Sequence, residues 1–166
     1  MRCYTQGGHT RTCVRCRQIT LFYERESANC DRGYYIINRI MLTLTLLDQT
    51  FTLHRLEPDA EIPTSALHSP FFAMMRTDDE TSLVLPDWVE IESDKSDTGW
   101  ACFKVEGPLD FSLVGILAGI ASVLAEVKVS IFALSTFDTD YILVKREQVG
   151  VAKEALRIAG YKVNES

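Results

Sequence analysis

Apolar and polar positions alternate most clearly in the second half of the chain. In Trp100–Val105, the apolar positions 101, 103 and 105 alternate with Cys102 and Lys104, which is the period of a half-buried strand. Gly107-Pro108 ends this strand, and Asp110 or Ser112 can cap a helix after it. The helix is predicted by one apolar stripe at helical spacing, formed by Leu113, Ile116, Leu117, Ile120, Leu124 and Val127.

Two strands, a second helix and a last strand follow. Val129–Ser135 is apolar on both sides and predicts a central strand. Asp140–Lys145 predicts its partner beyond the polar turn Thr136–Thr139. Gln148–Ala159 predicts a helix, and Tyr161–Asn164 predicts a short closing strand. The order β-α-β-β-α-β is that of a ferredoxin-like module, an antiparallel sheet with two helices on one face.

The first half is less regular. It predicts two hairpins, the first turning at Asp48–Thr50 and the second at Thr77–Thr81. Thr64–His68 is long enough for a single helical turn. The four strands are expected at Leu42–Leu47, Phe51–Leu56, Phe71–Arg76 and Ser82–Leu85.

These elements predict an α+β fold built from two ferredoxin-like modules. Residues 41–99 form the first module, which is poor in helix, and residues 100–166 form the second. The division rests on the order of the elements, because no residue-level repeat relates the two halves.

The first 40 residues differ from the rest in charge. They hold seven Arg and no Lys against three acidic residues, a balance of +4, whereas the remainder holds ten basic and twenty acidic residues, a balance of −10. Met41 stands at the change. We therefore expect residues 1–40 to come from a misassigned start, with Met41 as the natural one, or else to be a disordered extension.

Four of the five cysteines lie in the same 40 residues. His9, Cys13, Cys16 and Cys30 are a conceivable zinc set, but Cys13-x-x-Cys16 is a single pair that no second CxxC or HxxxH completes. No metal site is therefore predicted. Cys102 is expected to be a reduced thiol in the core.

Bulk composition restricts the partners. The net charge of −6 argues against nucleic acid, whose phosphates need a basic protein face. No apolar run approaches the ~18 residues of a membrane span, and residues 1–40 lack the apolar stretch and cleavage site of a signal peptide. We expect a cytoplasmic protein with no membrane partner.

Long motifs resemble those of small bacterial proteins built from tandem ACT domains. The longest are Gly107–Ala118 and Ile131–Val144, and Leu53–Ala60, Phe71–Glu80 and Trp100–Pro108 match the same proteins. The segments also resemble the ACT modules of aspartate kinases and of the cytosolic arginine sensor of animal nutrient signalling.

The resemblance covers about residues 41–164 and leaves out residues 1–40. It implies βαββαβ modules that pair side by side and bind free amino acids where modules meet, without a cofactor. We expect no attached catalytic domain, and the protein is therefore expected to be an amino-acid-binding sensor or regulator. It would be a homodimer that acts on a regulated partner protein or through its own oligomeric state. The resemblance does not say which amino acid binds.

The resemblance also points to ligand-binding positions in two segments. One is the loop and helix start from Gly107 to Gly115, and the other is the turn after the strand Val129–Ser135. Backbone amides at the start of the helix suit a ligand carboxylate, and Asp140 suits an ammonium group. Thr136, Phe137 and Asp140 match ligand-contacting positions of the arginine sensor. The full set is Asp110, Ser112, Leu113, Val114 and Gly115 in the first segment, and Ser135, Thr136, Phe137 and Asp140 in the second.

Simpler explanations exist for the same residues. The first segment offers two good helix caps, Asp110 and Ser112. The second segment suits a plain hairpin turn at Thr136–Thr139. An aromatic residue such as Phe137 is more often part of a core. The alternative function is a ligand-free module that pairs with other proteins through its sheet edges, and a small enzyme using the same pocket is a weaker alternative. An enzyme is not predicted, because the chain has no Ser-His-Asp set, P-loop, GxGxxG or carboxylate pair clearly placed in a cleft.

Overall fold

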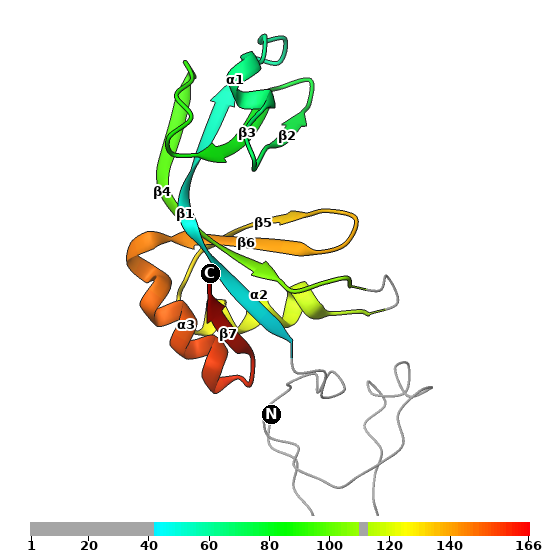
Figure 1. Ribbon diagram of the computed structural model, residues 1–166, viewed down its shortest axis with the longest axis vertical. Helices are drawn as coiled ribbons and strands as arrows, with labels where there is room; N and C mark the ends of the chain where they lie inside the picture. The colour runs from blue at the N-terminus through cyan, green and yellow to red at the C-terminus, as the bar shows by residue number, and fades with distance from the viewer. Residues whose placement is uncertain (1–41, 110–112) are drawn as a thin grey trace, which may run out of the picture. The chain divides into compact units, whose positions relative to one another are not determined.

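The computed structural model describes residues 42–109 and 113–166 (Figure 1). The expectations for residues 1–40, for a zinc set among them, and for Asp110 and Ser112 lie outside the described residues. In chain order the elements are β1 (Thr43–Leu56), α1 (Thr64–Leu67), β2 (Ala73–Arg76), β3 (Thr81–Pro86), β4 (Lys95–Val105), α2 (Ile116–Glu126), β5 (Ile131–Ser135), β6 (Asp140–Lys145), the 3-10 turn η2 (Arg146–Gln148), α3 (Val149–Ile158) and β7 (Lys162–Glu165).

All seven strands of the described residues belong to one sheet. Its order is β2-β3-β1-β4-β6-β5, and β7 joins it by pairing with β1. The β1–β7 pair is parallel, and every other pair is antiparallel. The expected α+β class with an antiparallel sheet is therefore confirmed.

Strand β1 corrects the first predicted hairpin. The chain does not turn at Asp48–Thr50 but continues as one strand from Thr43 to Leu56. Leu46 lies opposite Phe103 of β4 and Thr50 lies opposite Ala101, so β1 has two extra residues there. The polar triplet therefore marks a bulge, which interrupts an apolar pattern in the same way as a turn does.

The long strand β4 runs through the predicted module boundary, and β1 pairs with strands of both predicted modules. Thr43–Leu46 pairs with β7, whereas Phe51–Leu56 pairs with β3. Strand β4 starts at Lys95, five residues before the expected Trp100. A strand from the first half thus lies between β4 and β7 of the second half. The division into residues 41–99 and 100–166 stays a prediction.

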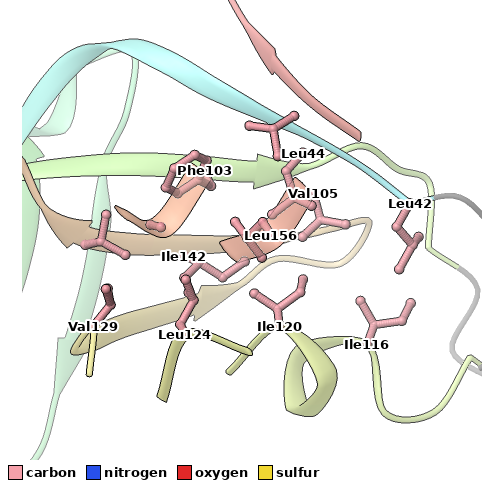
Figure 2. Close-up of a cluster of buried hydrophobic side chains, with 13 residues drawn as sticks. Leu42, Leu44, Phe103, Val105, Ile116, Ile120, Leu124, Val129, Ile142 and Leu156 are labelled. Atoms are coloured by element: carbon pink, nitrogen blue, oxygen red, sulfur yellow. The ribbon is translucent and has the colours of Figure 1, made fainter. Parts of the chain in front are cut away.

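Helices α2 and α3 pack against one face of the sheet (Figure 1). Figure 2 shows the buried side chains of this face, in which Ile116, Ile120 and Leu124 of α2 point toward the sheet. Their spacing of four residues is the helical stripe that the sequence predicted. The strands and α3 contribute Leu44, Phe103, Val105, Ile142, Val144 and Leu156.

The opposite face of the sheet carries a second apolar cluster, formed by Phe51, Val84, Trp100, Cys102 and Leu143. Cys102 is fully buried and unpaired, as expected for a core thiol. Burial raises the pKa of this thiol to about 12, so it stays protonated at neutral pH. A third cluster, under α1, contains Leu56, Ala66, Leu83, Leu85 and Val89.

Strand β5 was predicted to be central and instead lies at one end of the sheet order. The apolar pattern of β5 has another cause, because the strand contributes side chains to the apolar clusters on both faces of the sheet. Ile131 packs against the helix-side cluster and Phe132 against the opposite one. The Phe132 ring lies 6.5 Å from the Trp100 ring between centroids.

Replacing Ile120 with Ala is expected to lower the free energy of unfolding by about 2–5 kcal/mol, because the side chain is fully buried between α2 and the sheet. The matched control is Ile158→Ala on α3, where the side chain is 78% exposed. The control should change stability by less than about 0.5 kcal/mol. Urea unfolding of the two variants measures both values, and equal losses would contradict the assignment of α2 to the core.

His54 of β1 should make stability depend on pH. The residue is 8% exposed, and its Nδ1 lies 3.1 Å from Ser93 Oγ. Burial lowers the pKa of His54, against an opposing effect of the Asp87 carboxylate. Because the folded protein binds this proton less readily than the unfolded chain, stability is full above about pH 6.5 and falls as the pH drops from there.

The test is the difference in unfolding free energy between pH 7.5 and pH 5.5. His54→Gln should reduce this difference, because Gln does not titrate. His68→Gln is the matched control at an exposed histidine and should leave the difference as it is. An unchanged difference in His54→Gln would show that other groups cause the pH dependence.

Candidate functional site

Two hydrogen bonds join the loop after β4 to the turn between β5 and β6. The Leu109 N–H donates to the Asp138 carbonyl oxygen at 2.8 Å. The Thr139 hydroxyl donates to the Val105 carbonyl oxygen. Parts of the two segments that the resemblance assigned to ligand binding therefore lie side by side.

Gly107 makes this approach possible. A Cβ atom at this position would lie 2.6 Å from the Asp138 carbonyl oxygen and 3.3 Å from the Leu109 nitrogen. Real Cβ atoms do not come within 2.6 Å of a carbonyl oxygen, so a larger residue would displace the loop. The bond between Gly107 and Pro108 is cis. The sequence pattern identified Gly107 as the end of a strand, and the resemblance placed it at the start of the first ligand-binding segment, but neither gave a sign of the close contact.

The Thr136–Thr139 segment is a hairpin turn, as the simpler interpretation proposed. The Thr136 N–H donates to the Thr139 carbonyl oxygen at 2.8 Å, and the Thr136 hydroxyl donates to the same oxygen at 3.1 Å. Phe137 is not part of a core, since its side chain is 77% exposed at the tip. A turn of this kind holds Phe137 at the surface beside the loop and does not conflict with ligand binding.

Ser135 and Asp140 lie opposite each other at the ends of β5 and β6. The Ser135 hydroxyl donates to Asp140 Oδ1 at 2.6 Å. Side chains alternate between faces along a strand, so Asp140 lies on the same face as Ile142, which packs against the helices. The carboxylate is partly exposed and keeps lone pairs for a further donor.

Leu113, Val114 and Gly115 lead into α2. Leu113 packs against the helix-side core, whereas Val114 is 79% exposed. Gly115 takes the N-cap position with φ 85°, and no side chain there caps the helix. Sequence analysis placed the cap at Asp110 or Ser112, but the helix begins at Ile116 and its N-cap is Gly115. A positive φ favours glycine. Because Gly115 has no side chain to cap the helix, the first backbone N–H groups suit an anionic partner.

The contacts above link the loop with the turn, but they do not by themselves link Gly115 with Asp140.

Sequence analysis did not identify Thr139 as a functional residue and included it only in the turn. A threonine in a turn is ordinary, and nothing in the sequence shows that its hydroxyl reaches a carbonyl 34 residues away.

Two hollows lie elsewhere on the described part of the chain. One of 690 Å³ is lined by apolar residues such as Leu56 and Ile91 and by five acidic residues, Glu57, Glu61, Glu90, Glu92 and Asp94. The other, of 330 Å³, lies at the β1 bulge and is lined by Asp48, Arg146 and Glu165 among others. Neither includes a residue predicted to bind ligand.

Residues 42–109 and 113–166 contain no group of three or more His, Cys, Asp and Glu placed to hold a metal ion. Within the same ranges, none of the helices has the length and apolar character required to cross a bilayer.

Comparison with known sequences gives curated relatives of greater length. The chain is 30% identical over 122 residues to the cytosolic arginine sensor for mTORC1 subunit 1 of Mus musculus, which covers 68% of this chain and 37% of that protein. The protein of the same name from Rattus norvegicus is 31% identical over 123 residues, again with 37% of its length covered. The chain thus spans little more than a third of the curated relatives it matches.

Solved structures include relatives of similar size. Protein Atu0741 from Agobacterium tumefaciens is 33% identical, with a TM-score of 0.69, and the match covers 75% of this chain and 93% of that one. An aspartate kinase from Clostridium acetobutylicum has a TM-score of 0.53 at 18% identity, covering 68% of this chain and 33% of that one. At that identity the aspartate kinase supports the fold alone.

The ACT domain family matches residues 95–157. The match begins at the first residue of β4 and ends one residue before the end of α3, so it contains both segments of the candidate site. Together with the relatives above, this match shows that the chain belongs to the ACT-domain proteins.

Proposed function

We propose that the protein is an amino-acid-binding regulator whose ligand lies between the start of α2 and the β5–β6 turn. The observation that carries the proposal is the contact of Leu109 with Asp138 beside Gly107. It holds together two segments that the resemblance to ACT-domain proteins assigns to one ligand. The proposed contacts are Asp110, Ser112, Leu113, Val114, Gly115, Ser135, Thr136, Phe137 and Asp140.

The chemistry of the two segments suits the two ends of an amino acid. The uncapped start of α2 at Gly115 offers backbone N–H groups and the positive end of the helix dipole to a carboxylate. Asp140 offers a carboxylate to an ammonium group, and such a charge-assisted bond contributes about 1.5–3 kcal/mol. The Ser135 hydroxyl fixes the orientation of Asp140 by donating to its Oδ1.

Arginine is the first candidate ligand. The mouse and rat relatives carry arginine sensing in their names. Residues 41–166 hold ten basic and twenty acidic residues, and Asp138 and Asp140 flank the proposed site. This excess of negative charge favours a ligand with a cationic side chain.

We further propose two ACT-like modules in the chain and a homodimer in the cytoplasm. Protein Atu0741 matches over 75% of this chain, which is more than residues 95–157 alone. ACT modules pair side by side, and a second copy would supply the neighbouring module. Regulation would reach a partner protein through a ligand-dependent change in this assembly. Catalysis forms no part of the proposal.

The second candidate function is a ligand-free interaction module. The outward positions of α2 favour it, because Ala118, Ser122 and Ala125 are exposed, small and uncharged. Such a surface allows another helix to approach closely. The experiment below separates the two functions.

Thermal unfolding of the full chain against all twenty amino acids at millimolar concentration tests the proposal. At about 100 Kd a ligand of the native state adds about 2.7 kcal/mol, which corresponds to several degrees in Tm. We expect a selective rise with L-arginine that Asp140→Ala abolishes. Asp78→Ala, at an exposed Asp in the β2–β3 turn, is the matched control and should keep the rise. A flat panel would favour the interaction module, and a rise that survives in Asp140→Ala would place the ligand elsewhere.

Replacing Gly107 with Ala should weaken the same ligand, because the added Cβ displaces the loop from Asp138. The strain is expected to cost about 1–3 kcal/mol of stability. Gly150→Ala in α3 is the matched control, since its Cβ would meet nothing within 4 Å and Ala favours a helix by up to about 1 kcal/mol. Urea unfolding and calorimetric titration with L-arginine measure both effects. Undiminished affinity in Gly107→Ala would show that the loop is not part of the site.

A further inference from the structure

The ordered pairing of β4 with β6 stops just before the candidate site. Its register runs from Trp100 opposite Lys145 to Lys104 opposite Tyr141. Beyond this point a side chain continues the connection, because the Thr139 hydroxyl donates to the Val105 carbonyl oxygen. The next connection is the bond from the Leu109 N–H to the Asp138 carbonyl.

Thr139 is well placed to hold the loop. Its side chain is 7% exposed, so its hydrogen bond is shielded from competing water. A Cβ at Gly107 would lie 3.5 Å from Thr139 Cβ, which puts the Thr139 side chain against the loop backbone between the two hydrogen bonds. The loop is therefore held at Val105, Gly107 and Leu109 in succession.

The same residue also fixes the shape of the turn. Its carbonyl oxygen accepts hydrogen bonds from both the N–H and the hydroxyl of Thr136. Thr139 thus closes the turn with its backbone and holds the loop with its side chain. Through this one residue the position of the loop depends on the conformation of the turn.

We infer that Thr139 is a positioning residue that assembles the two halves of the ligand site without touching the ligand. The inference rests on the function proposed above. A site whose parts are already held together loses less conformational freedom when a ligand binds, and its affinity rises accordingly. Without the hydroxyl, the Val105 carbonyl would lose its partner in a buried setting, and the loop would separate from the turn more often.

The first test needs no ligand. Amide hydrogen exchange at Leu109 reports how often the loop leaves the turn. Thr139→Val removes the hydroxyl at nearly constant volume and is expected to speed exchange at Leu109 about tenfold. Thr139→Ser keeps the hydroxyl and should preserve the slow exchange. Unchanged exchange in Thr139→Val would overturn the inference.

The second test is calorimetric titration with L-arginine. Thr139→Val should bind about tenfold more weakly, which is a loss of about 1.4 kcal/mol in binding free energy. Thr139→Ser should bind with the same affinity as the parent protein. The control is Thr81→Val, which removes another buried threonine hydroxyl, one that donates to the Pro58 carbonyl oxygen at 3.0 Å. Thr81→Val should lower Tm without changing affinity, because Thr81 lies in β3, which pairs with β1 and β2 and not with the strands of the candidate site.

The outcomes separate the inference from the proposed function. If the parent binds no amino acid, the proposed function fails, and the exchange at Leu109 alone decides the role of Thr139 in holding the loop. If the parent binds and Thr139→Val binds equally well, the positioning role is refuted. Should Thr139→Val not fold, Thr139→Ser still decides, since loss of affinity or of Leu109 protection with the hydroxyl present contradicts the inference.

Discussion

The structure depends on the pairing of β1 with β4. The remaining strands attach, directly or through a neighbour, to one of these two, and β1 alone has three partners. One edge of β1 faces β4 along most of its length, while the other edge pairs first with β7 and then with β3. The two extra residues between Leu46 and Thr50 lie where this change of partner occurs. A regular strand would carry one register throughout, so the bulge lets a single strand serve two parts of the sheet.

The candidate site lies where this framework gives way to loops. Strand β4 ends at Val105, packed on the core by Phe103 and Val105, and the chain then leaves the sheet toward α2. Strands β5 and β6 meet at their turn beside it, with Ile142 fixed in the same core. The backbones on both sides are therefore held by core packing and strand pairing close to the ends of the strands. The short contacts of Gly107, Leu109 and Thr139 determine the geometry beyond that limit, which is why small changes there are expected to affect binding.

Sequence reasoning predicted the second half of the chain well and the first half less well. The stripe of α2 follows local periodicity, which survives in the fold because the helix faces one core. The strand Asp140–Lys145 also forms as predicted, with Ile142 and Val144 on the helix side and Leu143 on the opposite side. Periodicity gave a wrong prediction at Asp48–Thr50, because a bulge and a turn interrupt an apolar pattern with the same polar residues. It also gave a wrong position for β5, because a strand that is apolar on both sides need not be central in the sheet. In the site, composition and resemblance indicated the two segments. The close approach at Gly107 and the reach of the Thr139 hydroxyl depend on tertiary distances that no local pattern records.

The parallel pairing of β1 with β7 has a consequence for how the protein is made. Thr43–Leu46 leaves the ribosome early and Lys162–Glu165 late, and the two segments must find each other across more than a hundred residues. Contacts so distant along the chain slow folding. Until synthesis reaches β7, the early end of β1 has one unpaired edge, a template for another extended chain. An unpaired edge of this kind is prone to aggregation, so the interval during translation is a period of risk for this protein.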